Sequence, residues 1–249
     1  MVKGIDLFRV FFSDHTDQYV LIGGAACDVW FSDYEIDFRA TRDLDLVLIV
    51  EAQTKEFGQR FWDFIKQGKY KNRIKSNGKS QFYRFDKPEE PGFPSMIELF
   101  SRSNWELEQN TILTPVHIDD SVSSLSAILL NDAYYELLLE NRVIINGISV
   151  LKPACIIPFK AKAWLDLNEK TQKGEHVDSR DIKKHRNDAI RITSELMLDS
   201  CELSEIVKKD MREFVSKLHV SDEELKNLKL PGIHEADIIG RIKETYQLY

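Results

Sequence analysis

Residues 42–50, with the sequence RDLDLVLIV, restrict the fold more than any other part of the chain. The segment begins with charged and apolar residues in alternation and then becomes continuously apolar. This is the pattern of a strand that runs from solvent into a sheet covered on both faces. Such a sheet needs helices to cover it. We therefore expect a fold that mixes strands and helices, with the start of this strand at an accessible edge of the core.

The neighbouring segments follow the same mixed pattern. Residues 19–22 (YVLI) form a short apolar run that ends at a Gly-Gly pair and is followed by apolar residues at helical spacing. An amphipathic helix is expected around residues 57–65, and further strands at 81–85 and 95–100. The first part of the chain is therefore of the α/β or α+β class.

The chain changes character near Pro153. Residues 121–139 have a helical pattern, and an Asn-Gly pair at 146–147 between two β-branched runs predicts a hairpin. Beyond Pro153 almost every segment has helical periodicity. We expect two domains, a mixed domain at residues 1–152 and an α-helical bundle at residues 153–249.

Composition excludes several classes of protein. With 249 residues and 43% hydrophobic residues, the chain can bury a large core and is not intrinsically disordered. It has no uncharged apolar run near the roughly 20 residues that a membrane helix needs, and no secretory signal pattern at its start, so we expect no membrane association. The three cysteines are separated in sequence and lack zinc-site spacing. These features favour a reducing, cytoplasmic location.

Gly23-Gly24 and the pair Asp43 and Asp45 carry the chemistry that the sequence suggests. Residues two apart on a strand point to the same face, so the two carboxylates lie side by side. Two adjacent anions repel each other and are tolerated where a divalent cation neutralises them, and oxygen ligands favour Mg²⁺ or Mn²⁺. A glycine turn that opens a helix can hold phosphate. Together these features favour metal-assisted phosphoryl or nucleotidyl transfer.

Each of the two motifs also has a simpler explanation. The Gly-Gly pair could be only a tight turn, and the Asp-x-Asp pair could be only a solvated strand edge. The order strand, Gly-Gly, helix, Asp-x-Asp, with a third carboxylate on a later strand, favours the functional interpretation. Glu98 is our choice for that third carboxylate, because an acid among apolar strand residues needs a partner or a metal. Asp86 and Glu51 are competing choices. The structural alternative for Glu98 is an ion pair with Arg84 across a hairpin.

This arrangement resembles the nucleotidyltransferase superfamily with the polymerase-β-like core, whose pattern is hG[GS], a helix, Dh[DE]h and a third acid. Residues 22–24 (IGG) and 43–46 (DLDL) match this pattern in order and approximate spacing. Within the superfamily, residues 39–46 (RATRDLDL) look like the RxTxDhDh signature of the AbiEii-type toxins, which belong to abortive-infection and type IV toxin–antitoxin systems.

A second similarity lies beyond the predicted domain boundary. In the family a lysine heads one helix and a KDxxD motif lies in the next, and here KAKA at residues 160–163 is followed by Arg180-Asp181. The match is incomplete. Arg180 replaces the lysine of KDxxD and Lys184 replaces its last acid, for which Asp188 is a candidate substitute.

The resemblance implies a nucleotidyltransferase-like mixed sheet, with Asp43, Asp45 and Glu98 as catalytic metal ligands for Mg²⁺ or Mn²⁺. It also implies a set of nucleotide-binding residues: Gly23, Gly24, Arg39, Thr41, Lys160, Lys162 and Asp181. Lys160, or Lys162 in its place, would contact the triphosphate. Arg39 and Thr41 would orient Asp43 or touch phosphate.

The expected activity is transfer of a nucleoside monophosphate from an NTP to a hydroxyl acceptor, with release of pyrophosphate. A tRNA end, a protein hydroxyl and a small molecule are all compatible acceptors. If the chain is a toxin, the resemblance also implies a cognate antitoxin. Two alternatives remain: a catalytically silent relative that binds a nucleotide or a partner, and a metal-dependent phosphohydrolase that uses the same acids.

Overall fold

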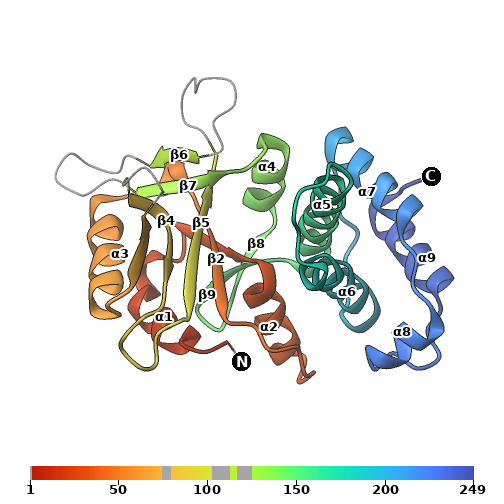
Figure 1. Cartoon of the computed structure of the whole chain (residues 1–249), viewed down its shortest axis with the longest axis horizontal. Coiled ribbons are helices and arrows are strands. Elements are labelled where there is room, and N and C mark those ends of the chain that lie inside the picture. Colours follow the sequence, from red (N-terminus) through yellow and green to blue (C-terminus); the bar gives the residue numbers. More distant parts are fainter. Residues whose placement is uncertain (1, 75–79, 103–112, 117–124) are drawn as a thin grey trace. The chain divides into compact units, whose positions relative to one another are not determined.

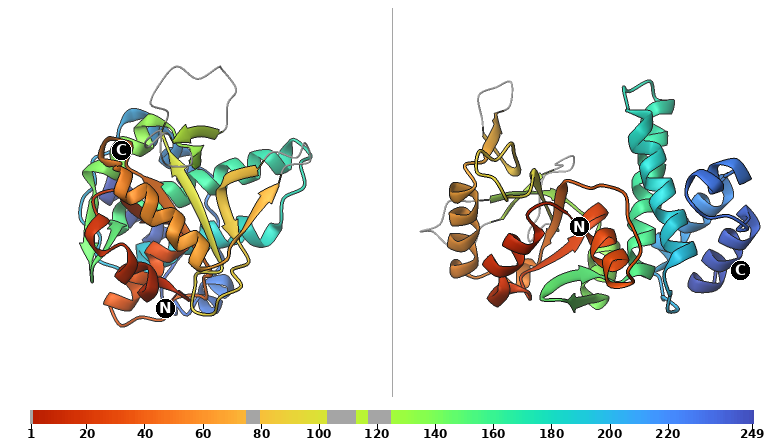
Figure 2. Two further views of the ribbon diagram at one scale, coloured as in Figure 1. Left: turned by 90° about the vertical axis from the view of Figure 1, so that its left-hand side faces the viewer. Right: turned by 90° about the horizontal axis from the view of Figure 1, so that it is seen from below.

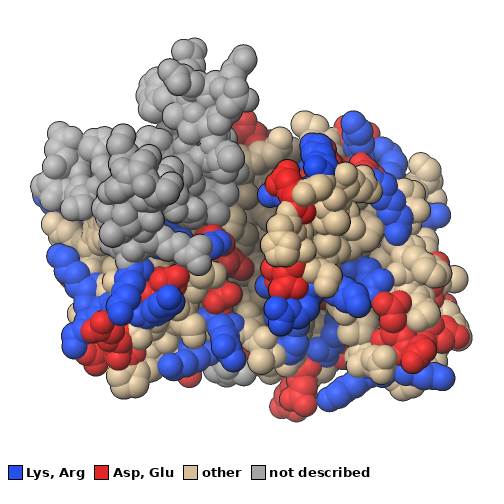
Figure 3. Space-filling model, viewed as in Figure 1, with Lys and Arg blue, Asp and Glu red and all other residues tan. Residues whose placement is uncertain are grey.

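The computed structural model describes residues 2–74, 80–102, 113–116 and 125–249. The chain divides into two compact units, Met1–Leu151 and Lys152–Tyr249. Within the described ranges, none of the helices has the length and hydropathy needed to cross a lipid bilayer. Figure 3 shows acidic and basic side chains interspersed over the visible surface of each unit.

In its described residues the first unit contains one nine-stranded sheet and four α-helices (Figure 1). The strands are β1 (Tyr19–Ile22), β2 (Asp43–Leu48), β3 (Lys71–Ile74), β4 (Ser80–Asp86), β5 (Met96–Ser101), β6 (Leu113–Val116), β7 (Leu125–Leu129), β8 (Arg142–Ile145) and β9 (Ile148–Leu151). The helices are α1 (Ile5–Phe11), α2 (Gly23–Asp33), α3 (Lys55–Gln67) and α4 (Asp132–Glu140), with short 3₁₀ turns η1 (Ser13–His15) and η2 (Val50–Ala52).

The sheet is mixed, with the strand order β3-β4-β5-β2-β1-β9-β8. The pairs β2–β5, β1–β9 and β5–β7 are parallel, and the other pairs are antiparallel. One edge of β5 is shared, because β4 pairs with its first half and β7 with its end, while β6 extends from β7. The predicted class of mixed strands and helices is confirmed.

Most of the predicted elements form where the sequence places them. The strands expected at residues 19–22, 42–50, 81–85 and 95–100 correspond to β1, β2, β4 and β5. The predicted hairpin joins β8 to β9, and its turn residues Asn146 and Gly147 have φ values of 49° and 78°. Positive φ at both central residues is what a type I′ turn requires, which explains the Asn-Gly pair.

The helix predicted over residues 121–139 is wrong at residues 125–129, which form a strand, and is confirmed from Asp132 onward. The apolar run at residues 125–130 (LSAILL) contains strand β7, which pairs with β5, and helix α4 begins only at Asp132. A short apolar run suits a buried strand as well as a helix, and sheet pairing decides between them. Residues 117–124 lie outside the described part of the chain.

One face of the sheet packs against α1 and α3 through aromatic rings. Phe8 of α1 contacts Tyr19 of β1 and Phe64 of α3, and Phe61 of α3 contacts Phe85 of β4. Leu44 and Leu46 of β2, at 0% exposure, lie on the same face as Tyr19 by strand register. The alternate residues of β2, Asp43 and Asp45, therefore lie on the opposite face.

The second unit is helical throughout its regular elements, which are α5 (Pro153–Gln172), α6 (Ser179–Glu195), α7 (Glu205–Lys217), α8 (Asp222–Asn227) and α9 (Glu235–Tyr246). Figure 2 shows these helices in two further views. Trp164 of α5 packs edge-on against Phe214 of α7. The Tyr246 hydroxyl of α9 donates a 2.5 Å hydrogen bond to the Ala154 carbonyl.

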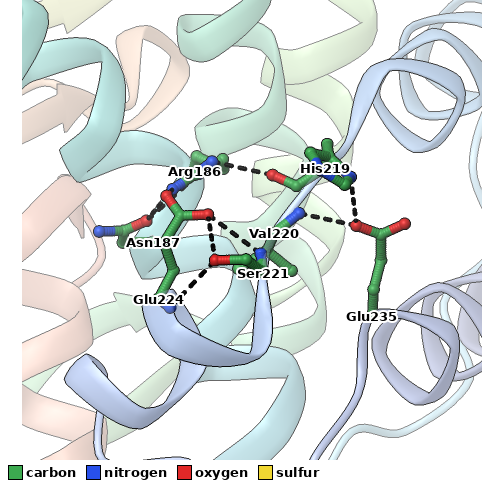
Figure 4. Close-up of polar contacts among 7 residues, drawn as sticks. All are labelled: Arg186, Asn187, His219, Val220, Ser221, Glu224 and Glu235. Carbon is green, nitrogen blue, oxygen red and sulfur yellow. Dashed lines mark hydrogen bonds and ion pairs between the residues drawn. The ribbon is translucent and has the colours of Figure 1, made fainter.

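A polar network joins α6 to the last two helices (Figure 4). Arg186 donates to the Glu224 carboxylate at 2.5 Å and to the His219 carbonyl at 2.8 Å. Glu224 also completes the capping box that begins α8, because its side chain accepts the Ser221 N–H. Arg186 is the first cause of the lowered pKa of Glu224, followed by the hydrogen bond from Ser221.

The three cysteines are in the reduced thiol form, and all are buried. Although Cys155 and Cys201 are distant in sequence, their sulfur atoms lie 3.2 Å apart in the helical unit. The spacing of the cysteines in the sequence therefore does not predict this contact.

Candidate active site

The turn between β1 and α2 requires both of its glycines. Gly23 has φ +69°, a conformation that side chains with a Cβ rarely adopt. A Cβ at Gly23 would lie 2.9 Å from Cγ of Asp45, inside contact distance, and even closer to one carboxylate oxygen. The Asp45 carboxylate therefore occupies the space that the missing side chain leaves. It lies beside the start of α2, where the helix dipole favours negative charge.

Gly24 brings the Arg39–Thr41 segment against the same turn. A Cβ at Gly24 would lie 2.6 Å from Oγ1 of Thr41 and 3.2 Å from a guanidinium nitrogen of Arg39. The guanidinium of Arg39 also lies over the Phe38 ring, 5.1 Å from its centroid. Four of the residue positions chosen from the sequence, together with Asp45, thus meet at the glycine turn. The backbone N–H groups of a helix start, a guanidinium and a hydroxyl could together bind an anion here, next to the Asp45 carboxylate.

Replacing Gly23 with alanine is expected to lower the free energy of unfolding by more than the strained backbone conformation alone would. The left-handed conformation costs a residue with a Cβ roughly 1–2 kcal/mol, and the new methyl group must also displace Asp45. Gly92→Ala is the matched control, because Gly92 has φ +91° with nothing within 4 Å of the added Cβ. Thermal unfolding of both variants should show the larger loss for Gly23→Ala. Equal losses of stability in the two variants would mean that the position of the Asp45 side chain does not require a glycine at residue 23.

The acids selected from the sequence lie in two rows across the sheet. In one row Asp45 of β2 is paired with Glu98 of β5, which is paired with Arg84 of β4. In the neighbouring row Met96 of β5 lies between Asp43 and Asp86. Residues paired across strands share a face, so all three carboxylates of the predicted metal site are on the face opposite α1 and α3.

Glu98 is engaged by Arg84 in the way that the structural alternative predicted. The Arg84 Nε donates to a Glu98 carboxylate oxygen at 2.7 Å, and a second guanidinium nitrogen forms an ion pair with the same oxygen. Glu98 is 8% exposed, so this pair satisfies a buried charge. Arg84 engages one oxygen of this carboxylate, so a metal ion would have to be bound through the other oxygen or after Glu98 has left Arg84.

The fit of a divalent cation is therefore good for two acids and incomplete for the third. Asp43 and Asp45 are partly exposed and provide the oxygen ligands that Mg²⁺ prefers. Within the described ranges, no three Asp, Glu, His or Cys side chains are grouped closely enough to hold a metal ion. Asp86, one of the competing choices, lies one strand beyond Glu98.

Glu51, the other competing choice, lies beyond the opposite end of β2 from Asp43. Its carboxylate accepts a hydrogen bond from the Tyr135 hydroxyl at 2.7 Å and forms an ion pair with Arg102. Partial burial raises the pKa of Glu51, but the hydrogen bond from Tyr135 and the charge of Arg102 outweigh it and lower the pKa overall. Glu51 does not lie with Asp43 and Asp45.

The position and burial of Lys160 differ from those expected of a lysine that contacts the triphosphate. Helix α5 begins at Pro153, so Lys160 lies about two turns inside it and does not head the helix. The lysine is 2% exposed, and its Nζ donates to the Asp188 carboxylate of α6 at 2.7 Å. Asp188 is 1% exposed. The acid that we considered as a substitute in the KDxxD motif is therefore the partner of Lys160 in a buried ion pair.

Lys162 and Asp181 are more accessible. Lys162 is partly exposed, and its ammonium group lies 2.9 Å from Asp166 and 3.9 Å from Asp210. Burial lowers the pKa of Lys162, but its hydrogen bond to Asp166 and the nearby carboxylate charges outweigh this effect and raise it overall. Asp181 is exposed in the first turn of α6, with Lys184 at 4.0 Å.

Sequence reasoning missed Asp28, a buried acid in α2. Asp28 is 5% exposed and accepts a 2.6 Å hydrogen bond from the backbone N–H of Val2. The available signal was an acid at helical spacing among apolar residues of the segment AACDVWF, which indicates a buried carboxylate that needs a donor. Its donor comes from an N-terminal segment for which no structure was predicted.

The chain matches no model of a known protein family, no curated protein and no solved structure. The resemblance to nucleotidyltransferases therefore depends on the glycine turn, the Asp-x-Asp strand and the residues that meet around them.

Proposed function

We propose that this chain is a metal-dependent nucleotidyltransferase that moves a nucleoside monophosphate from an NTP to a hydroxyl acceptor and releases pyrophosphate. One observation carries the proposal: the Asp45 carboxylate fills the space left by Gly23 at the start of α2. The contact brings a glycine turn of the kind that can bind phosphate next to an acidic strand, although Gly23 and Asp45 are 22 positions apart in sequence, and this chemistry needs both.

The roles of the residues follow from where they lie. Asp43 and Asp45 would hold Mg²⁺ or Mn²⁺, which when bound supplies charge neutralisation at the phosphates and lowers the pKa of the attacking hydroxyl. The backbone of Gly23 and Gly24 would bind phosphate oxygens at the positive end of α2. Arg39 and Thr41, which contact Gly24, would hold the same phosphates in line for transfer.

The finer proposal is that the chain belongs to the AbiEii-type branch, as the toxin of a toxin–antitoxin or abortive-infection system. It depends on the RATRDLDL signature and on the contact of Arg39 and Thr41 with the glycine turn. A tRNA end or a protein hydroxyl would then be the acceptor, and the partner would be a cognate antitoxin.

Incubation with each α-labelled NTP, Mg²⁺ and cell lysate tests the activity, because transfer labels an acceptor and releases unlabelled pyrophosphate. Release of labelled NMP as the main product, with no labelled acceptor, would instead indicate a hydrolase. Asp63→Asn, which changes an exposed acid of α3, is the control for nonspecific effects of lost charge.

A silent nucleotide-binding relative is the second candidate, and the Arg84–Glu98 ion pair favours it because that pair engages one oxygen of the third acid. Mg²⁺ with NTP is expected to raise the melting temperature in either case, since a ligand at 100 times its Kd stabilises the native state by about 2.7 kcal/mol. Stabilisation without labelled product from any NTP would support the silent relative. Absence of stabilisation at millimolar ligand would contradict both candidates.

A further inference from the structure

A cavity of about 580 Å³ adjoins the glycine turn in the first unit. Its polar lining residues come from four separate segments of the chain. They are Lys3, Asp28, Arg39, Thr41, Arg42 and Ser95. Arg39 and Thr41 also lie next to Gly24, so the cavity shares two residues with the proposed nucleotide site.

The charges and donors of this cavity suit an anion. Lys3, Arg39 and Arg42 contribute three positive charges against the single carboxylate of Asp28. That carboxylate is buried and already accepts the Val2 N–H. In the described part of the chain, neither Lys3 nor Arg42 has an ion-pair partner, and the hydroxyl groups of Thr41 and Ser95 add neutral donors. Guanidinium, ammonium and hydroxyl groups together are typical of a phosphate site.

The backbone that carries the two exposed cations is held in place. Val2 is 4% exposed and is fixed by its hydrogen bond to Asp28, while a Cβ at Gly4 would lie only 2.6 Å from the Phe93 carbonyl carbon. Lys3 is thus anchored on both sides. The Ser95 N–H donates to the Arg42 carbonyl at 3.2 Å, which fixes the opposite wall. The backbone of this cavity therefore loses little conformational entropy on binding, and the entropy cost comes from ordering the Lys3 and Arg42 side chains.

We propose that this cavity binds a phosphate group, and that Lys3 and Arg42 are its specificity-determining cations. Naming the source as the polyphosphate of a nucleotide rests on the proposed function, whereas the anion site itself does not. The cavity extends along α2 to Asp28, one turn beyond Gly24, so the phosphate that it holds would lie next to the glycine turn.

Calorimetric titration of the full chain with inorganic pyrophosphate, in the absence of divalent metal, tests the anion site. Arg42→Gln and Lys3→Gln are each expected to weaken binding about 10-fold, the size of one charge-assisted contact to phosphate. Added salt should weaken binding to the parent. Lys66→Gln, which changes an exposed lysine of α3, should leave the affinity unchanged. Equal affinity in the parent and the double variant would overturn the proposal, as would an equal loss in Lys66→Gln.

Two further measurements separate this proposal from the activity. Asp43→Asn should bind pyrophosphate at least as tightly as the parent, because Asp43 does not line the cavity and the substitution removes a negative charge next to Arg42. If the two cavity variants bind pyrophosphate more weakly and the parent shows no transfer, the anion site is supported and the proposed activity is contradicted. Competition identifies the source: displacement of pyrophosphate by ATP supports a nucleotide. Displacement only by a short single-stranded RNA without terminal phosphates would overturn the nucleotide assignment.

Discussion

Replacement of Lys160 by methionine is expected to lower the stability of the helical unit by about 3–5 kcal/mol, the usual cost of removing one partner of a buried ion pair. The reason is that Asp188, at 1% exposure, would keep a buried carboxylate without its cation. In a unit of roughly 100 residues this corresponds to a melting temperature lower by at least about 10 °C. Differential scanning calorimetry measures the shift directly.

A double-mutant cycle distinguishes the ion pair from loss of packing. Asp188→Leu alone should be similarly destabilising, and Lys160→Met with Asp188→Leu should be more stable than either single variant, because no charge is left buried. Lys170→Met, an exposed lysine on the same helix, is the matched control. If Lys160→Met melted like the parent and bound NTP roughly 10- to 100-fold more weakly, Lys160 would instead be the triphosphate contact that the sequence predicts.

Local patterns in the sequence predict six of the nine described strands, because such patterns depend on neighbouring residues alone, whereas β3, β6 and β7 are not predicted as strands. The pattern of residues 42–50 (RDLDLVLIV) predicts both a strand and its solvent-accessible start. The Asn146-Gly147 pair predicts the β8–β9 turn, because both residues readily adopt positive φ. In the helix expected over residues 121–139, residues 125–129 instead form strand β7, because a short apolar run suits either structure and here it pairs with β5.

The candidate site is predictable only in part, for the same physical reason. The Gly-Gly and Asp-x-Asp motifs each follow from local spacing, but the contact between Gly23 and Asp45 depends on the pairing of β1 with β2. The partners of Glu98 and Lys160 come from other elements. A sequence motif shows that a charged residue is present. Whether that residue binds a ligand or forms a structural ion pair depends on its burial and on its partner in the fold.

The sharpest test of the activity is the loss expected from Asp43→Asn and Asp45→Asn. Each substitution removes a negative charge without changing side-chain volume, and both acids are partly exposed on a strand whose core residues are untouched. Transfer should fall by at least about 100-fold, as for removal of a single electrostatic group from an active site. The melting temperature without ligand should stay near that of the parent, and the rise with Mg²⁺ and NTP should shrink.

Glu98→Gln and Asp86→Asn then decide which acid completes the site. If Glu98 moves from Arg84 to the metal, Glu98→Gln should lower transfer as strongly as the Asp43 substitution, while Asp86→Asn leaves it near the parent value. If the Arg84–Glu98 pair is only structural, Glu98→Gln should lower the melting temperature, because it weakens a buried charge pair, and transfer by the folded protein should persist. Near-normal transfer in Asp43→Asn and Asp45→Asn would remove the metal assignment altogether, whatever the result for Glu98.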